Sequence, residues 1–467
     1  MKTFLDHDDT ITAIATSPGI GAIAVVRVSG KDAIQIADSI FKAKKKSLKL
    51  EDCKSHTIHF GTIEDDNTIV DEVLVSIFKS PNSFTGEDSV EISCHGSVFI
   101  QQQIIQLIIR KGARLAQPGE FTLRAFLNGK FDLSQAEAVA DLIASDSTAS
   151  HQLAMQQMRG GFSSEIKTLR HELIHFASLL ELELDFAEED VEFANRDQLK
   201  ALILTLDSKI LNLITSFQLG NVIKHGIPVV IAGKPNVGKS TLLNALLNEE
   251  RAIVSEIAGT TRDTIEEEIT LGGIKFRFID TAGIRETTDT IEKIGVGKTM
   301  EKIQQSPVLI YIFDVNESNA VDIKKEIEEL KNNIEDEKFI ILPVANKIDH
   351  HNIEELKKKY AGVNGIIFIS AKEKLNIDQL TKALLSKMNT TGLAQRDVVV
   401  SNARHLEALT KTREALSHAY EGLQTKRTTD FISSDIKYAL HHLGEITGEI
   451  TTDDLLENIF SKFCIGK

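Results

Sequence analysis

Residues 233–240 read GKPNVGKS and fit the pattern G-x-x-x-x-G-K-[ST], which wraps a loop around phosphate groups. The run IPVVIA before them predicts a buried strand, and TLLNALLN after them has leucines at helical spacing. Glycines in such a turn let backbone amides converge on a phosphate, and the helix N-terminus adds positive potential. Lys239 is placed to reach the β- and γ-phosphates of a nucleotide, and Ser240 to contact Mg²⁺. We therefore expect an α/β domain built on a parallel sheet.

Two later segments predict contacts around the terminal phosphate. The sequence DTAG at 280–283 follows the strand IKFRFI, so Asp280 can hold Mg²⁺ through water and the amide of Gly283 can meet the γ-phosphate. Thr261, in GTTRD, is a loop hydroxyl able to close on Mg²⁺ when the γ-phosphate is present.

Two more segments predict selectivity for guanine. NKID at 346–349 follows the strand FIILPVA, and Asp349 can accept hydrogen bonds from guanine N1 and N2, which adenine does not supply in that pattern. SAK at 370–372 follows GIIFI and can close over the base. Each motif is weak alone, but in this order, each after a strand, they favour a GTP-binding domain over a Rossmann-like domain without nucleotide.

The sequence does not settle how water is activated for hydrolysis. Many small GTPases carry a glutamine directly after the D-x-x-G glycine, and here that position is Ile284. Glu286 is a candidate to orient the water, or it is a solvated loop charge. Asn236 can offer its side-chain oxygen to a monovalent cation in place of an arginine finger, or it is only a turn residue.

Composition restricts the class of protein. A chain of 467 residues is long enough for roughly three domains, and its formal charge of −15 argues against broad coating of nucleic acid. The three cysteines have neither metal nor disulfide spacing, which favours a reducing cytoplasm. No apolar run reaches the length of a membrane span, and the acidic, polar N-terminus does not resemble a signal peptide.

Residues 1–130 have the pattern of an α+β domain. ITAIATSPGIGAIAVVRVS predicts two paired strands, and further strands are predicted at HTIHFGTI, EVLVSIF and SVEISCHG, with helices at 31–42 and 97–112. Arg27 interrupts the second strand, where it is either solvated or aimed at a ligand. Two stretches, 81–96 and 117–143, mix Pro/Gly turns with aromatics, and they are simple turns or the lining of a pocket.

From about residue 134 to 219 the pattern is helical. One stripe at helical spacing predicts the core of a bundle: Ile166, Leu169, Leu173, Phe176 and Leu180. Residues 220–226 have the composition of a short linker, and segments 396–423 and 433–456 are helical again. Because the two ends of an inserted domain lie close in space, both helical segments are expected to pack as one bundle that responds to the nucleotide.

Cys464 lies close to the end of the chain in an aromatic and aliphatic setting. A packed, inert cysteine is the default interpretation, and a catalytic role would require a neighbour that lowers the pKa of the thiol. The sequence shows no obvious local base, although Lys462 and Lys467 are near.

Taken in order, seven segments resemble the tRNA modification GTPase family MnmE (TrmE). They are PNSFTGED, PGEFTLRAFLNGK, GKPNVGKS, IAGTTRD, DTAGIRE, NKID and EITGEITTDDLLENIFSKFCIGK. The resemblance covers the chain from end to end, and the opening domain and the terminal FCIGK are more specific than the GTPase motifs. It implies an N-terminal α+β dimerisation and folate-binding domain (1–130), a discontinuous helical domain (131–222 and 389–467) and an inserted Ras-like G domain (223–388).

The resemblance also implies the roles of individual residues. GTP would be bound by Asn236, Val237, Gly238, Lys239, Ser240, Thr241, Ser255, Glu256, Ile257, Ala258, Gly259, Thr260, Thr261, Asp280, Thr281, Ala282, Gly283, Asn346, Lys347, Asp349, Ser370, Ala371 and Lys372. Potassium would contact Asn236, Ser255, Ile257 and Thr260, and magnesium Ser240 and Thr261. Glu286 and Lys239 would act in hydrolysis. A tetrahydrofolate derivative would contact Arg27, Glu91, Lys130 and Lys467, and Cys464 would lie by the modification site. Ser255 and Ile284 depart from the threonine and leucine often found in the family.

The implied function is potassium-dependent GTP hydrolysis in the modification of the tRNA wobble uridine, with an aminomethyl-type group installed at carbon 5. The one-carbon unit would come from 5,10-methylene- or 5-formyl-tetrahydrofolate, and a homodimer would work with the flavoprotein MnmG (GidA) on tRNA in the cytoplasm, away from membranes. Two other classes stay open: a ribosome-assembly GTPase, which would carry a basic RNA-binding module, and a dimeric scaffold that uses GTP only to open and close. The amine donor, glycine or ammonium, is left open.

Overall fold

The computed structural model describes residues 9–44, 48–66, 68–186, 195–249, 266–280, 306–332, 339–387 and 398–466. The chain divides into two compact units. The first comprises residues 1–143, 154–214 and 404–467, and the second comprises residues 144–153 and 215–403.

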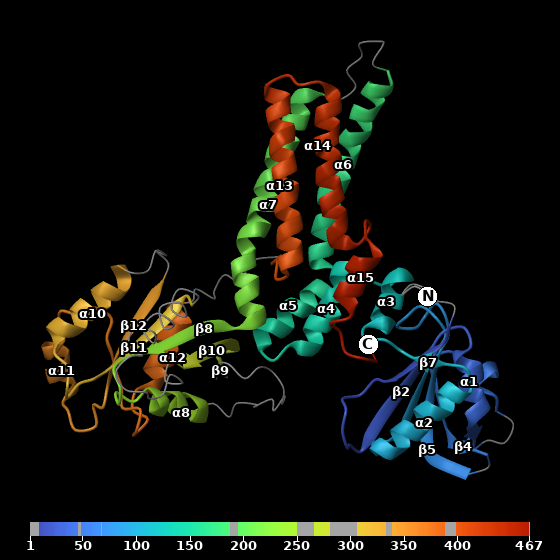
Figure 1. Ribbon diagram of the computed structural model, residues 1–467, viewed down its shortest axis with the longest axis horizontal. Helices are drawn as coiled ribbons and strands as arrows, with labels where there is room; N and C mark the ends of the chain where they lie inside the picture. Colours follow the sequence, from blue (N-terminus) through green and yellow to red (C-terminus); the bar gives the residue numbers. More distant parts are fainter. Residues whose placement is uncertain are drawn as a thin grey trace, which may run out of the picture. The chain divides into compact units, whose positions relative to one another are not determined.

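The first unit contains a seven-stranded sheet in the order β3-β4-β5-β6-β2-β1-β7 (Figure 1). Its strands are β1 (Ile11–Ile14), β2 (Ile23–Ser29), β3 (Phe41–Ala43), β4 (Thr57–Asp65), β5 (Thr68–Phe78), β6 (Ser89–His95) and β7 (Arg114–Leu115). β1 and β2 pair in antiparallel register, which confirms the strand pair predicted around the Pro-Gly turn. β2 and β6 are also antiparallel, and their register sets Arg27 directly opposite Glu91.

Helices cover one face of this sheet because its strands alternate apolar and polar residues. Val26, Val28, Val90 and Ile92 are buried in a common core with α1 (Ala33–Ile40) and α2 (Val98–Arg110), and a 3₁₀ turn lies at Leu50–Asp52. Both helices fall within the ranges predicted from the sequence. A short helix, α3 (Glu120–Leu127), follows β7 and leads toward the helical part of the chain.

A helical bundle lies mostly in the first unit; residues 148–153 of α5 and 215–225 of α7 belong to the second unit. The elements of the bundle are α4 (Leu133–Ala144), α5 (Thr148–Met158), α6 (Gly161–Asp185), α7 (Arg196–His225), α13 (Ala403–Gln424), α14 (Thr429–Thr447) and α15 (Asp453–Phe460). Ser433 of α14 donates a hydrogen bond to Glu181 of α6 at 2.9 Å, and Nε of Arg413 on α13 lies 2.7 Å from Asp207 on α7. Segments more than 200 residues apart therefore pack as one bundle, as predicted (Figure 1).

Two expectations about this region were wrong. Residues 220–226 are not a linker, because α7 continues through Gly220 to His225. A Cβ at Gly220 would clash with the carbonyl of Val400, so this glycine permits a close backbone approach and does not end the helix. The segment 433–456 is also not one helix: α14 ends where Gly448 adopts φ 81°, and Thr452 caps a new helix by accepting a bond from the amide of Leu455.

The long helix α7 bears on the expectation that no apolar run reaches the length of a membrane span. Within the described part of the chain, α7 is the one helix long and apolar enough to span a membrane by length and composition. Its apolar side chains do not form an uninterrupted run; they recur at helical spacing, and six of them are buried: Leu199, Ile203, Leu206, Ile210, Leu213 and Ile223. α7 therefore packs one apolar face against the other helices of the bundle.

The second unit is built on a six-stranded sheet in the order β13-β12-β11-β8-β10-β9, parallel except for the edge strand β9. The strands are β8 (Ile227–Ala232), β9 (Glu266–Leu271), β10 (Ile274–Asp280), β11 (Val308–Asp314), β12 (Ile340–Asn346) and β13 (Ile367–Phe368). Its helices are α8 (Lys239–Glu249), α10 (Ala320–Asn332), α11 (Ile353–Lys359) and α12 (Ile377–Lys387).

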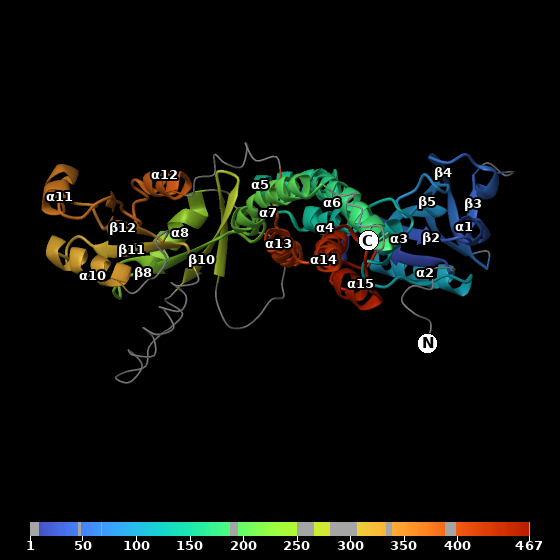
Figure 2. The same ribbon diagram turned by 90° about the horizontal axis from the view of Figure 1, so that it is seen from above.

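Helices cover both faces of this sheet, as a parallel sheet requires. α8 and α12 share one apolar core with the sheet, and α10 and α11 share another on the opposite face. Figure 2 shows α10 and α12 on opposite sides of the strands. The α/β fold predicted from the phosphate-loop motif is confirmed.

Candidate nucleotide site and N-terminal cluster

The predicted phosphate loop lies between β8 and α8, at the carboxyl end of the central strand. Gly238 has φ 103°, and a Cβ there would collide with the side-chain amide of Asn346. Only glycine combines that conformation with that close approach. The loop backbone therefore turns tightly into the first turn of α8, where amides and the helix dipole favour an anion.

Lys239 is held over this loop. Its Nζ donates hydrogen bonds to the carbonyl oxygens of Gly233 at 2.9 Å and Lys234 at 3.0 Å. The ammonium group thus lies inside the curve that the loop amides form. Ser240 and Thr241, in the first turn of α8, are exposed, so their hydroxyls are accessible to a ligand or a cation.

Asn346 has a structural role that the sequence did not reveal. Its side chain is buried; the amide nitrogen donates to the carbonyl of Val237 at 2.8 Å, and the oxygen accepts from the backbone amide of Ala371 at 3.0 Å. One side chain therefore fastens the NKID and SAK segments to the phosphate loop. This tie brings together three segments that are spread over more than 130 residues of sequence.

The other residues predicted to recognise guanine lie in the two segments that Asn346 joins to the phosphate loop. Asp349 accepts a hydrogen bond from the hydroxyl of Ser370, which links the two segments a second time. Lys347 has φ 68°, and its Nζ lies 2.8 Å from Asp314 at the end of β11. The charge of Lys347 and hydrogen bonds from Asn316 outweigh burial and lower the pKa of Asp314. Lys372 is largely exposed.

Several predicted site residues lie outside the described residues. They are Ser255, Glu256, Ile257, Ala258, Gly259, Thr260, Thr261, Thr281, Ala282, Gly283, Glu286 and Lys467. The backbone of Asp280 is described and ends β10, beside the phosphate-loop strand β8.

Arg27 is not a solvated strand charge. Its Nε and Nη2 donate to Glu91 Oε1 at 3.0 and 2.8 Å, and its guanidinium lies over the rings of Phe84 and Phe121, 5.4 and 5.6 Å from their centroids. The pair is only partly buried, so a cationic plane held between two aromatic rings stays accessible to solvent. Phe84 and Phe121 come from the two Pro/Gly-rich stretches that the sequence left as turns or a pocket lining.

Lys130, which was predicted to contact a folate together with Arg27 and Glu91, lies beside the stretch 81–96. A Cβ on Gly86 would come within 3.5 Å of Lys130 Cε, and the neighbouring Asn128 donates to the carbonyl of Thr85 at 2.8 Å. The end of α3 is thereby fastened to the loop that carries Phe84. Lys130 itself is exposed.

A buried charge cluster that the sequence analysis missed supports these loops. Arg124 of α3 has a fully buried side chain and forms ion pairs with Asp9 at 2.6 Å, Glu87 at 3.1 Å and Glu120 at 3.0 Å. Arg114 adds a second guanidinium against Glu120 at 2.5 Å. The only available signal was a Glu-x-x-x-Arg spacing on a short helix, which is common on helix surfaces.

Burial and pairing move the pKa values of the two glutamates in opposite directions. Burial raises the pKa of Glu87, against the charge of Arg124 and a hydrogen bond from Ser29. Burial alone would also raise the pKa of Glu120, but hydrogen bonds from Arg114 and the Gln117 amide, together with the arginine charges, lower it. The cluster therefore holds Glu120 firmly as a carboxylate.

The C-terminal tail docks on the same part of the first unit. Phe460 of α15 is buried in a cluster with Leu123 and Leu133, and the carbonyl of Cys464 accepts from the amide of Gly119 at 3.3 Å. Cys464 itself is exposed, so the expectation that it is packed was wrong.

Comparisons with known proteins agree with this arrangement. Residues 10–130 match the family described as GTP-binding protein TrmE N-terminus, and residues 133–464 match the family described as MnmE helical domain. The chain belongs to the MnmE family. The two matches span the described sheet of the first unit, the bundle and the docked tail, so membership of the MnmE family rests on the whole chain and not on GTPase motifs alone.

Full-length relatives carry the same family name. A Cytophaga hutchinsonii protein named tRNA modification GTPase MnmE is 56% identical, covering 100% of this chain and 99% of its own. A Bacteroides thetaiotaomicron protein of the same name is 50% identical, covering 99% of this chain and 100% of its own. A solved structure of Aquifex aeolicus Era bound to GDP·AlF₄⁻ is 28% identical over 40% of this chain and 66% of its own, with a TM-score of 0.27, too low to support an inference about shape.

Proposed function

We propose that this chain hydrolyses GTP to drive modification of the wobble uridine of tRNA. The observation that carries the proposal is the full-length match to the MnmE family together with a phosphate loop tied to the NKID and SAK segments by Asn346. The relatives are named as tRNA modification GTPases, whereas a ribosome-assembly GTPase would share only the nucleotide domain.

In the proposed reaction, the loop amides and Lys239 neutralise the β- and γ-phosphates, and Asp349 selects guanine. Magnesium fits Ser240, because an exposed hydroxyl at the first turn of α8 offers the oxygen ligand that this cation prefers. Bound magnesium would supply positive charge to the transferring phosphoryl group. Thr261, Asp280 and Glu286 are proposed to complete the site.

Potassium is proposed to bind at the phosphate loop and to take the place of an arginine finger. Asn236 supports this proposal because it is exposed in the loop, has φ 61° and carries an amide oxygen on a short side chain. Ser255, Ile257 and Thr260 are proposed to supply the remaining oxygens.

A tetrahydrofolate derivative is proposed as the one-carbon donor, bound around Arg27. The partly exposed guanidinium between Phe84 and Phe121 and the carboxylate of Glu91 suit a flat, conjugated ring with hydrogen-bonding edges. Lys130 and Lys467 are proposed to assist, and Cys464, exposed on the tail beside Gly119, is proposed to lie by the modification site.

The remaining parts of the proposal concern assembly. We place a homodimer through residues 1–130, a discontinuous helical domain at 131–222 and 389–467, and a G domain at 223–388. The chain is proposed to act in the cytoplasm with the flavoprotein MnmG on tRNA. Family membership supports this assembly.

Steady-state GTP hydrolysis in potassium and in sodium at matched ionic strength tests the cation mechanism. A strong potassium-specific stimulation is expected, and both Asn236→Ala and Asn236→Gly should lose it. The glycine variant is the control for backbone conformation, because glycine adopts positive φ without strain. Equal rates in both salts would remove the role proposed for Asn236.

Nucleoside analysis of tRNA separates the enzyme from a dimeric scaffold. Cells that lack this chain should lose the modified wobble uridine, and Arg27→Ala should weaken binding of 5-formyl-tetrahydrofolate without changing GTP hydrolysis. Unchanged tRNA nucleosides together with no folate binding would favour the scaffold.

A further inference from the structure

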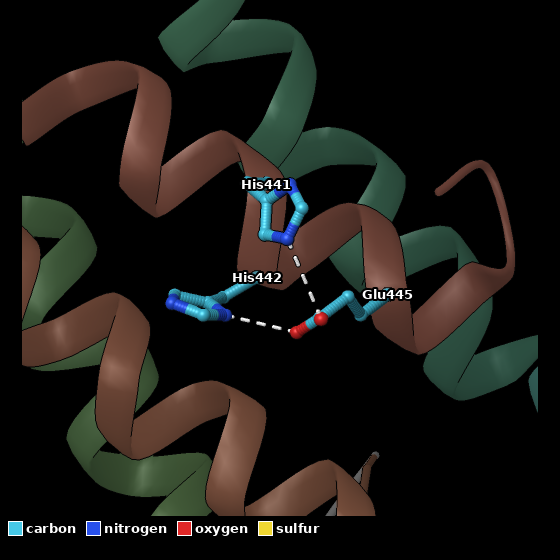
Figure 3. Close-up of side chains that lie close together, drawn as sticks. All are labelled: His441, His442 and Glu445. Atoms are coloured by element: carbon cyan, nitrogen blue, oxygen red, sulfur yellow. Dashed lines mark hydrogen bonds and ion pairs between the residues drawn. The ribbon is translucent and has the colours of Figure 1, made fainter. Parts of the chain in front are cut away.

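Three side chains that the proposed function does not use lie together on α14 (Figure 3). They are His441, His442 and Glu445. His441 and Glu445 are one helical turn apart, so they share a face, and His442 lies three residues before Glu445. Figure 3 shows hydrogen bonds or ion pairs from both rings converging on the one carboxylate.

The distances suit a single small cation. His441 Nε2 lies 3.5 Å from Glu445 Oε1, and His442 Nδ1 lies 2.9 Å from Glu445 Oε2. One ligand atom from each residue lies within 4.8 Å of the others. A tetrahedral zinc ion with bonds of about 2.0–2.1 Å holds its ligand atoms roughly 3.3 Å apart. Small side-chain rotations therefore convert the observed cluster into three ligands.

Neighbouring groups restrict the two rings. The ring centroid of Tyr438 lies 6.3 Å from that of His441 in a stacked arrangement and 5.0 Å from that of His442 in an edge arrangement. His442 is buried, and Glu445 is partly buried. Contacts of this kind restrict the rotamers of the two rings, so less conformational entropy is lost when a metal binds.

The charges near the cluster also favour a cation. Glu407 and Lys411 of the neighbouring helix α13 form an ion pair of 2.7 Å, and the hydrogen bond and charge of Lys411 lower the pKa of Glu407. Lys411 is thereby neutralised locally, and Glu445 leaves one net negative charge when both histidines are neutral. Arg404, which donates to the backbone carbonyl of Glu445 at 2.6 Å, is likewise paired with a carboxylate, that of Glu137.

We propose that His441, His442 and Glu445 bind a divalent transition-metal ion of the zinc class, with solvent completing its coordination. Two imidazole nitrogens and one carboxylate oxygen suit zinc better than magnesium or calcium, which prefer oxygen ligands alone. The ion replaces the hydrogen bond between His442 Nδ1 and Glu445; a neutral ring then carries its one proton on Nε2, and a protonated ring releases one proton to solvent. The ion ties together the last turns of α14, just before Gly448.

The test uses full-length, untagged, nucleotide-free protein that has been stripped of metal with a chelator. Zinc affinity is measured by competition with a chromophoric chelator, and cobalt(II) is added separately to record visible d–d absorption. We expect one equivalent to bind, and His441→Ala and Glu445→Gln each to weaken zinc binding by at least ~10-fold. Zinc should raise the melting temperature of the wild type and leave that of Glu445→Gln unchanged.

Two controls make the result decisive. His151→Ala removes an exposed histidine of α5 outside the cluster and should bind zinc as the wild type does. Cys464→Ser removes the exposed thiol as a competing ligand. Because His441 is exposed and glutamine is isosteric with glutamate, both test variants are expected to fold, which circular dichroism checks. Equal zinc binding by wild type and both test variants, or loss only in Cys464→Ser, would overturn the proposal.

Discussion

The nucleotide site and the charge cluster around Arg124 are assembled in different ways. Each part of the nucleotide site is a short contiguous segment that follows a strand, and the sheet brings the segments together where Asn346 bonds to Val237 and Ala371. The Arg124 cluster consists of single side chains from the N-terminus, a loop, a short strand and a helix. Backbone-built sites leave contiguous motifs in a sequence, whereas networks of side chains do not.

Removing Arg124 should give the largest effect and should fall on the first unit. Arg124→Met keeps an unbranched side chain but leaves Glu87 and Glu120 without their buried partner, so the free energy of unfolding should fall by about 3–5 kcal/mol. Thermal unfolding and hydrogen exchange measure this loss. GTP hydrolysis by the folded protein should be unchanged, because the nucleotide site does not contain this residue.

Arg110→Met is the matched control for Arg124→Met. Arg110 pairs with Asp65 at 2.5 Å, but its side chain is more than half exposed, so its loss should cost less than about 1 kcal/mol. A comparable loss in both variants, or loss of GTP hydrolysis in Arg124→Met, would break the contrast between the two regions.

Lys239→Ala is expected to have the opposite effect: it should slow GTP hydrolysis and leave the free energy of unfolding nearly unchanged. Removing the ammonium group that lies over the phosphate loop should lower kcat/KM for GTP by ~10²–10³-fold, as the loss of one donor to a developing anion does. Steady-state phosphate release measures it, and Lys382→Ala on the exposed face of α12 is the control. Retention of full activity would remove Lys239 from the site.

Another buried group of ion pairs, around Glu137, predicts how stability depends on pH. The charges and hydrogen bonds of His405 and Arg404 outweigh the burial of Glu137 and hold its pKa at about 2, below the ordinary 4.5. Because the pKa is lowered in the folded state, its stabilisation is complete above pH 4.5 and is lost as the pH falls toward 2. A lowering of this size corresponds to a stabilisation on the order of 3 kcal/mol.

Glu137→Gln isolates this contribution. The variant should be less stable than the wild type at pH 7, and the difference should shrink as the pH is lowered below 4.5. Melting temperatures recorded for both proteins between neutral and acid pH measure it. A difference that stays constant over this range would show that Glu137 does not titrate as described.

The smallest effect is expected at Gly220, in the second unit. Gly220→Ala places a methyl group against the carbonyl of Val400 and should lower the free energy of unfolding by about 1–3 kcal/mol. Gly362→Ala is the control, because a Cβ there meets no atom within 4 Å. Equal stability of the two variants would show that the backbone of Val400 does not restrict the side chain at position 220.

The sequence by itself determined the local chemistry of this protein. The GKPNVGKS loop, its flanking strand and helix, the order of the guanine-recognition segments and the paired strands at 11–29 follow from residue type and spacing. Glu286 and Thr261 lie outside the described residues, so the roles predicted for them stay predictions.

Only the tertiary structure decided the contacts between distant segments. It placed the guanidinium of Arg27 over the rings of Phe84 and Phe121 and joined Asn346 to Val237 by a hydrogen bond. It also showed that α7 runs through Gly220, where the glycine lets the backbone of Val400 approach. Periodicity reports which face of an element is buried, but it does not report which other element covers that face. The partners of a buried side chain therefore follow from packing alone.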